Sequence, residues 1–183
     1  YNLRVLDDDR RAFPPYQAAW VVRQQTLQRL PQLKPVLEIF ANAVSDADMT
    51  DLNYAADYQK QSPETVARRF LEKRGLLDGP TFPGPPGTVT IGSKVFTEQY
   101  ILAEMLRQLV ERRTTLRVAA KTGLGGTQIC FDALRTGGID LYPEYTGTGL
   151  GVVLREDTAG TAEQVLARVR EGYRERFNLG WVA

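Results

Sequence analysis

The run from Ile139 to Thr148 brings together residue types that could hold a small ligand. It begins with apolar residues typical of a strand and continues through Pro143 and Glu144 to Tyr145 and the tripeptide Thr-Gly-Thr. We expect the Pro-Glu pair to form a turn, because proline fixes φ and favours turn positions. The strand end would then present an aromatic face, hydroxyl groups and backbone N–H groups to a ligand.

A second tyrosine has a similar local setting. Tyr16 follows Phe13 and two prolines, which hold the chain extended. Taken alone, either Tyr16 or Tyr145 could be a surface or packing residue. Lys94 and Thr148 are also expected near the carboxyl ends of strands, where parallel sheets bind ligands. Together the four residues predict a ligand cleft at that edge of the sheet.

The composition excludes several kinds of chemistry. The 183 residues include no histidine and one cysteine, Cys130, and the formal net charge is +1. These values argue against histidine-based catalysis, a cysteine- or histidine-rich metal site and nucleic-acid binding. Glu98 and Glu144 could form a carboxylate pair, but we interpret them as a helix-start charge and a turn residue. The sequence thus predicts a non-enzyme without metal or cofactor.

Two short glycine-containing loops precede predicted helices. Gly92-Ser93-Lys94 could offer N–H groups and a cation to an anion, although it lacks the spacing of a Walker A loop. The loop 123–126 is interpreted as a tight turn between a strand and a helix, because it lacks the dinucleotide-binding fingerprint. Cys130 lies between apolar neighbours and is expected to be buried.

The arrangement of elements predicts an α/β fold. Residues 78–87 contain four prolines and three glycines and are interpreted as a linker between a mostly helical segment, 1–77, and a strand–helix segment, 88–183. Strands are expected at 2–6, 19–22, 88–91, 116–120, 139–142 and from 179, and helices at 24–30, 32–43, 45–58, 63–74, 97–113, 127–135 and from 162. Alternating strands and helices with short connections predict a mainly parallel central sheet flanked by helices.

Several motifs resemble one known family. They are Ile91–Gln99, Leu124–Thr127, Ile139–Thr148, the stretch from Leu3 to Tyr16 with its Phe-Pro-Pro-Tyr motif, and Ser62-Pro63-Glu64. These segments resemble the glycine betaine/choline-binding proteins, which are the substrate-binding subunits of osmoprotectant ABC importers. The resemblance implies a type II periplasmic-binding-protein fold, and it covers nearly the whole chain outside the linker.

The resemblance also implies roles for the four candidate residues. Members hold a quaternary ammonium group in a box of tyrosines, since a methylated ammonium has no N–H donors and binds aromatic faces by cation–π attraction. Tyr16 and Tyr145 match two of these tyrosines. Lys94 and Thr148 match positions that contact the polar end of the ligand, and a lysine suits the carboxylate of a betaine. The residues do not choose among glycine betaine, choline, carnitine, proline betaine and a thiol-imidazole betaine.

The order of the motifs differs from that of the family. Residues 1–77 resemble the family's C-terminal segment and 88–183 its N-terminal segment, so we expect one circularly permuted lobe with the second lobe missing. Tyr1 and Ala183 both fall about where relatives cross between lobes. An alternative is a fragment of a tandem array, with another small amino-acid-like ligand.

The resemblance implies partners and a location. The partners would be the quaternary ammonium ligand, the second lobe and an ABC permease in the membrane. The location would be periplasmic or otherwise extracytoplasmic and associated with the cell surface, with a signal peptide or lipid anchor outside these residues. A different possibility is the effector-sensing domain of a transcriptional regulator, which can share the fold, although no helix-turn-helix segment is recognisable.

Overall fold

The protein is built around a mixed sheet. The computed structural model describes residues 8, 13 and 15–183, and in this part of the chain the strands form one five-stranded sheet in the order β3-β2-β4-β1-β5. The strands are β1 (Ala18–Arg23), β2 (Phe82–Gly92), β3 (Thr114–Lys121), β4 (Leu141–Tyr145) and β5 (Leu179–Val182). β2 is parallel to β3 and β4, whereas β1 is antiparallel to β4 and β5. Only β1 therefore runs against the others, which confirms the predicted α/β class and mainly parallel sheet.

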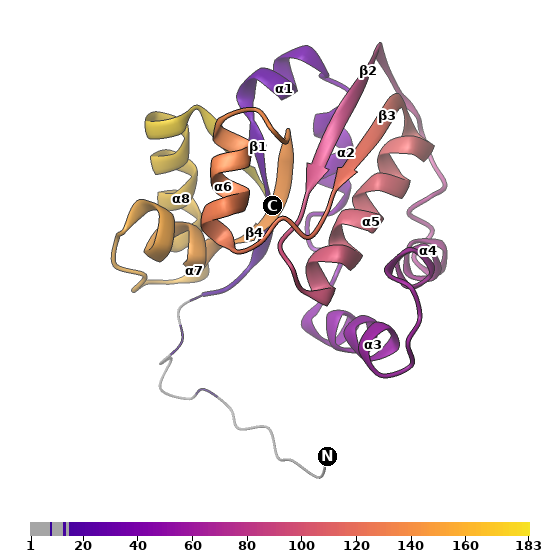
Figure 1. The fold of residues 1–183 in the computed structure, drawn as a ribbon, viewed down its shortest axis with the longest axis horizontal. Helices are drawn as coiled ribbons and strands as arrows, with labels where there is room; N and C mark the ends of the chain where they lie inside the picture. The colour runs from indigo at the N-terminus through magenta and orange to yellow at the C-terminus, as the bar shows by residue number, and fades with distance from the viewer. Residues whose placement is uncertain (1–7, 9–12, 14) are drawn as a thin grey trace.

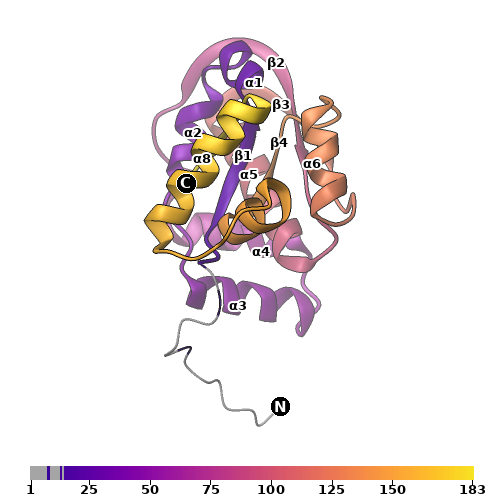
Figure 2. The ribbon, with the colours of Figure 1, turned by 90° about the vertical axis from the view of Figure 1, so that its left-hand side faces the viewer.

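Helices cover both faces of the sheet (Figure 1). They are α1 (Gln24–Arg29), α2 (Leu33–Ile39), α3 (Asp46–Asp57), α4 (Pro63–Lys73), α5 (Thr97–Arg113), α6 (Thr127–Arg135), α7 (Thr146–Thr148), the π-helix η1 (Gly149–Leu154) and α8 (Ala162–Phe177). The two faces have separate apolar cores, one shared with α2–α5 and the other with α6, η1 and α8. Figure 2 looks onto the second face, with α8 and α6 in front of β1 and β4.

The strand β1 serves both cores because its side chains alternate. Trp20 and Val22 belong to the core under α2–α5, whereas Ala19 and Val21 belong to the core under α6 and α8. All four side chains are buried. Successive residues of a strand point to opposite faces, so a buried strand covered on both sides reads as a continuous apolar run.

Local capping residues set the starts of several helices. Ser45 and Asp48 form a capping box at the start of α3, and the Ser62 side chain accepts a hydrogen bond from the Thr65 N–H at the start of α4, as the sequence predicted. α2 ends at Ile39, earlier than expected, and Asn42 has a left-handed backbone with φ 58° in the turn that follows. The predicted strand at 2–6 lies outside the described residues.

The segment interpreted as a linker is held against the fold. β2 begins at Phe82 rather than at the predicted Thr88. Its pairing with β3 is interrupted between Phe82 and Gly87, so the prolines in between occupy positions where the ladder is irregular. The Arg113 guanidinium donates hydrogen bonds to the carbonyls of Leu76, Asp78 and Pro80, which secures the approach to β2.

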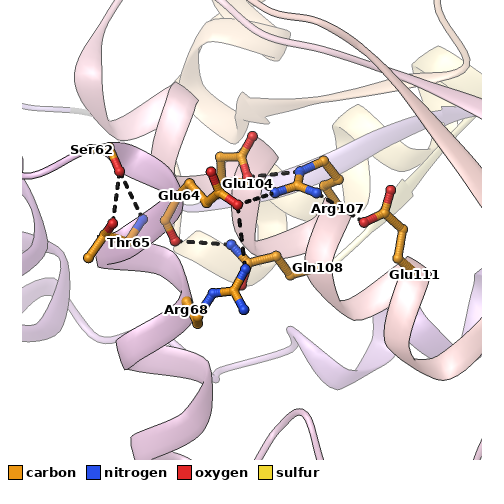
Figure 3. Close-up of polar contacts among 8 residues, drawn as sticks. All are labelled: Ser62, Glu64, Thr65, Arg68, Glu104, Arg107, Gln108 and Glu111. Atoms are coloured by element: carbon orange, nitrogen blue, oxygen red, sulfur yellow. Dashed lines mark hydrogen bonds and ion pairs between the residues drawn. The ribbon is translucent and has the colours of Figure 1, made fainter.

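A polar network joins α4 to α5, and so joins the two segments on either side of residues 78–87 (Figure 3). Arg107 lies at its centre and forms ion pairs with Glu64 at 3.3 Å, Glu104 at 2.8 Å and Glu111 at 3.0 Å. The hydrogen bond that Arg107 donates to Glu104 is the main reason that the pKa of Arg107 is raised. Gln108 donates to the Glu64 carbonyl at 3.0 Å. These contacts orient α4 on α5 above the shared apolar core.

Two kinds of feature are absent from the described residues. No helix in the described part of the chain is both long and apolar enough to cross a membrane. Residues 8, 13 and 15–183 contain no group of three or more cysteine, aspartate or glutamate side chains placed to hold a metal ion.

The charge of Asp48 should contribute to stability in a pH-dependent way. Hydrogen bonds from Ser45, followed by the contact with Arg74 at 2.6 Å, lower the pKa of Asp48 well below its ordinary value of 3.8. A carboxyl with a lowered pKa in the folded state stabilises the protein above its unfolded-state pKa, and this contribution is lost as the pH falls through the folded-state pKa. We expect wild type to be more stable than Asp48→Asn at pH 7 and the difference to shrink below about pH 4.

Urea denaturation at pH 7, 5 and 3 measures this difference. Asp51→Asn on the same helix is the control, and its difference from wild type at pH 7 should be smaller. A gap between wild type and Asp48→Asn that is equally large at pH 7 and pH 3 would contradict the assignment.

Candidate functional site

The pairing of β1 with β4 brings Tyr16 to Tyr145. Ala18 lies opposite Tyr145 in this ladder. Just before the ladder, the Thr146 N–H donates to the Gln17 carbonyl at 3.0 Å, and the Gln17 N–H donates to Thr146 Oγ1 at 3.2 Å. These bonds extend the contact by one residue on each side, so Tyr16 arrives beside the carboxyl end of β4.

Three of the four predicted site residues contact one another directly. The rings of Tyr16 and Tyr145 are stacked with centroids 5.2 Å apart and an interplanar angle of 26°. The hydroxyl groups of Tyr16 and Thr148 are hydrogen-bonded at 2.5 Å. Phe96 also stacks on Tyr145, with centroids 6.3 Å apart. Since the two tyrosine rings touch, no ammonium group fits between them in this arrangement.

The central ring, that of Tyr145, is buried and fixed at its hydroxyl. The hydroxyl donates to Glu98 Oε1 at 2.5 Å and accepts a longer hydrogen bond from Gln99 Nε2 at 3.4 Å. Burial raises the pKa of Tyr145 far above 10, and the nearby carboxylates of Glu98 and Glu144 raise it further. The phenol is therefore a neutral donor at any physiological pH.

Lys94 lies in a buried ion pair with Glu144. Both side chains are almost completely inaccessible, with 5% and 0% of their surface exposed. Glu144 also accepts hydrogen bonds from the Tyr145 N–H at 2.8 Å and the Tyr142 hydroxyl at 3.1 Å. The ammonium of Lys94 is 5.1 Å from the centroid of the Tyr145 ring. In this structure the lysine charge is thus matched inside the protein and placed beneath the aromatic ring.

The interpretation of Glu144 as a turn residue is wrong. Pro143 and Glu144 are strand residues of β4, opposite Trp20 and Ala19 of β1. Proline is tolerated here because β2 pairs with β4 only at Leu141, so at Pro143 no hydrogen bond to β2 is required. A buried carboxylate in a central strand needs a partner, and Lys94 supplies it.

The glycine loops bond to each other. Gly123 N–H donates to Ser93 Oγ at 3.0 Å and Leu124 N–H to the Ser93 carbonyl at 3.0 Å. The Lys94 N–H donates to the side chain of Gln99. These three N–H groups are therefore used within the protein and are not free for an anion. Cys130 is buried as expected, and burial raises the pKa of its thiol to about 11.

An open groove of about 670 Å³ runs past the two tyrosines. It lies between α2–α3 on one side and β1, β4, β5 and α8 on the other. Its polar lining comes from Tyr16, Gln17, Asn42, Ser45, Asp46, Thr50, Asn53, Glu98, Tyr145 and Arg170. Trp20, Leu37, Phe40 and Met49 are among its apolar residues. Lys94 and Thr148 do not line it, so of the four predicted residues the groove exposes only the two tyrosines.

Sequence reasoning gave no site role to three residues of this region. Glu98 and Phe96 contact the Tyr145 hydroxyl and ring, and Asn53 donates a hydrogen bond to Glu98. Phe96 and Glu98 belong to the same motif as Lys94, so their nearness could have been inferred from it. Asn53 comes from α3, and no local pattern signals its approach to Glu98.

Removal of one partner of the buried ion pair should be strongly destabilising. Lys94→Met keeps the length of the side chain but leaves the Glu144 carboxylate buried without a cation. We expect this variant to lose about 3–5 kcal/mol of unfolding free energy, measured by urea denaturation.

The double variant Lys94→Met/Glu144→Gln tests whether the unpaired Glu144 carboxylate causes the loss of stability. It removes both charges, so it should be more stable than Lys94→Met alone. A single Lys94→Met variant that loses less than about 1 kcal/mol, or a double variant that is less stable than it, would contradict the buried pair.

Comparison with known proteins identifies a family that matches both segments and several individual relatives. The family described as the substrate binding domain of ABC-type glycine betaine transport system, OpuAC, matches residues 1–73 and 87–182. An ergothioneine transport permease/ergothioneine binding protein, EgtU, of Helicobacter pylori is 41% identical over 75 residues, which are 41% of this chain and 14% of that protein.

Two further relatives are binding proteins. The carnitine transport binding protein OpuCC of Listeria monocytogenes is 37% identical over 79 residues, 43% of this chain and 26% of that protein. A glycine-betaine-binding protein of Pseudomonas aeruginosa is 41% identical over 78 residues, 43% of this chain and 25% of that protein. The matched stretches thus span about a quarter or less of each relative.

The family match covers nearly all of the chain on both sides of residues 74–86, and the sheet has the α/β architecture expected for one lobe of such a protein. This chain belongs to the family of substrate-binding domains of ABC-type glycine betaine transport systems.

Proposed function

We propose that this chain forms one ligand-binding lobe of an ABC importer's substrate-binding protein, and that its ligand is a small quaternary ammonium compound such as glycine betaine or choline. The observation that carries the proposal is the contact between Tyr16 and Tyr145 beside an open groove. Two aromatic rings from distant parts of the sequence meet there, and the family resemblance implies that both contact the ligand.

Cation–π attraction would supply the binding energy. A quaternary ammonium offers no N–H donor, but its positive charge is attracted to aromatic faces and its methyl groups pack against them. Tyr16 is 58% exposed and Phe96 43% exposed, whereas Tyr145 is 9% exposed. We infer that the ammonium binds at the groove end of this stack, against Tyr16 and the accessible part of Tyr145.

We also propose that the chain is a circularly permuted lobe. Residues 1–77 would be the family's C-terminal segment, 88–183 its N-terminal segment, and 78–87 the connection. The two matched stretches on either side of residues 74–86 support this, as does the insertion of β1 between β4 and β5. The alternative, the junction of two tandem binding units, would use the same contacts.

The partners follow from the proposed role. A second lobe would close on the ligand from the open side of the groove, and an ABC permease would receive the ligand from the closed form. The expected location is extracytoplasmic, in the periplasm or at the cell surface. The proposed function is non-enzymatic and requires no cofactor.

Tyr145 should determine affinity through its ring rather than its hydroxyl. We expect Tyr145→Ala to weaken quaternary ammonium binding about 5- to 30-fold, which corresponds to about 1–2 kcal/mol for one aromatic wall. Tyr145→Phe keeps the ring and should retain most of the affinity. Titration of the ¹⁵N-labelled chain with tetramethylammonium, glycine betaine and choline, followed by NMR shifts, measures this.

Tyr58→Ala is a matched control, because Tyr58 is 72% exposed and stacks on Tyr54 away from the groove. It should leave the affinity unchanged. If Tyr145→Ala bound all three ligands as tightly as wild type while folded, the proposed aromatic site would be wrong.

A single lobe should bind weakly. The absence of two aromatic walls from a second lobe, at about 1–2 kcal/mol each, predicts an affinity about 30- to 1000-fold below that of a complete two-lobe protein. Isothermal titration calorimetry of the chain with glycine betaine should therefore show no micromolar binding. A micromolar Kd would show that the lobe needs no partner.

A further inference from the structure

We propose that Glu98 sets the ligand class of this site, so that the groove prefers a quaternary ammonium compound with a net positive charge and a hydroxyl group over a zwitterionic betaine. This inference rests on the proposed function. It identifies Glu98 as a specificity-determining residue and choline-type cations as the favoured ligands.

The first observation is an unneutralised carboxylate at the groove end. Glu98 lines the groove next to Tyr145 and accepts hydrogen bonds from the Tyr145 hydroxyl at 2.5 Å and from Asn53 Nδ2 at 3.4 Å. Both donors are neutral groups. Within residues 8, 13 and 15–183, Glu98 has no ion-pair partner. Its negative charge is thus available to a cation bound on the tyrosines.

The second observation is that the expected partner of a betaine carboxylate, Lys94, is already paired within the protein. Lys94, which the resemblance places at the ligand's polar end, is buried and paired with Glu144. A lysine in this state cannot serve a ligand carboxylate without leaving Glu144 uncompensated in the interior. The site therefore lacks the cation that a betaine needs from this lysine.

The remaining charges of the groove lining do not replace it. Arg170 donates to the Trp181 carbonyl at 3.3 Å. Trp181 of β5 lies opposite Val21 of β1, and Tyr145 of β4 lies opposite Ala18 of β1. Val21 and Ala18 are three residues apart along β1. At about 3.3 Å per residue, the backbone position to which Arg170 is hydrogen-bonded lies about 10 Å along the sheet from that of Tyr145. Arg170 is thus engaged with β5 rather than with the residues that contact Tyr145.

The net charge of the groove lining also favours a ligand with a net positive charge. Its charged side chains in the described part of the chain are Asp46, Glu98 and Arg170, which sum to −1. A net-cationic ligand gains from this charge, whereas the two ends of a zwitterion experience opposing forces.

A third observation concerns hydrogen bonding. Asn53 also lines the groove, and its Oδ1 is buried without a hydrogen-bond donor among the described residues. Its Nδ2 is already directed at Glu98. A ligand hydroxyl could donate to the Glu98 carboxylate, and to Asn53 Oδ1 once a side-chain shift exposes that atom, whereas a betaine carboxylate brings only further acceptors. The polar surroundings thus match a ligand that carries a donor.

The test compares ligands of similar size and different charge. The ¹⁵N-labelled full chain is titrated with choline, glycine betaine and glycine betaine methyl ester, which has the betaine skeleton without its negative charge. We expect choline and the ester to bind about 3- to 10-fold more tightly than glycine betaine. The factor is modest because the Glu98 carboxylate is partly exposed and solvent screens its interaction with the ligand charge. Equal or tighter binding of glycine betaine to the wild-type chain would overturn the inference without any variant.

The Glu98→Gln variant tests whether the preference for choline over glycine betaine depends on the Glu98 charge. This substitution should bring the choline-to-betaine affinity ratio close to one. Glu163→Gln is the matched control, since Glu163 is likewise the second residue of a helix, α8, and does not line the groove. It should leave the ratio at its wild-type value. A folded Glu98→Gln variant with an unchanged ratio would overturn the inference.

These outcomes separate the two proposals. If choline and glycine betaine bind equally and Tyr145→Ala weakens both, the quaternary ammonium site stands and the role of Glu98 is wrong. If no ligand shifts the signals of residues around Tyr145, the proposed function itself is wrong.

Discussion

The antiparallel insertion of β1 between β4 and β5 is the constraint on which the rest of the structure depends. β1 belongs to the first segment of the chain and its two neighbours to the second, so the sheet is continuous only if the segments fold together. Its alternating side chains supply both cores. Its first residues also position Tyr16 on Tyr145, so that the same hydrogen bonds that complete the sheet assemble the candidate site.

The second structural requirement is a buried ion pair under that site. Glu144 lies in the central strand β4, where an unpaired carboxylate would be costly, and Lys94 from the loop after β2 neutralises it. The pair, together with the Tyr142 hydroxyl and the Tyr145 N–H, leaves the backbone around Tyr145 little freedom. A ring held in this way can offer one face to a ligand without first having to be ordered. In this geometry Lys94 neutralises Glu144 from beneath the Tyr145 ring.

The parts of the fold with local determinants could be predicted from sequence. The caps at Ser45 and Ser62 and the strand–helix alternation after residue 88 depend on neighbours in the chain, and the structure has them. Pro143 and Glu144 were misread because proline is a local turn signal, whereas their place in β4 depends on distant strands. The pairing of Lys94 with Glu144 likewise has no local signature. The nearness of Tyr16 to Tyr145 was expected from their positions at strand ends and from the family resemblance, and the roles of both in binding remain proposals.

The central claim is that both segments of one chain form a single lobe in which β1 pairs with β4. Isotope-filtered NMR on a dilute mixture of labelled and unlabelled chain tests it most directly. We predict nuclear Overhauser effects between Ala18 and Tyr145, and between the rings of Tyr16 and Tyr145, within a single chain. The absence of these contacts, or their appearance only between labelled and unlabelled molecules, would contradict the account.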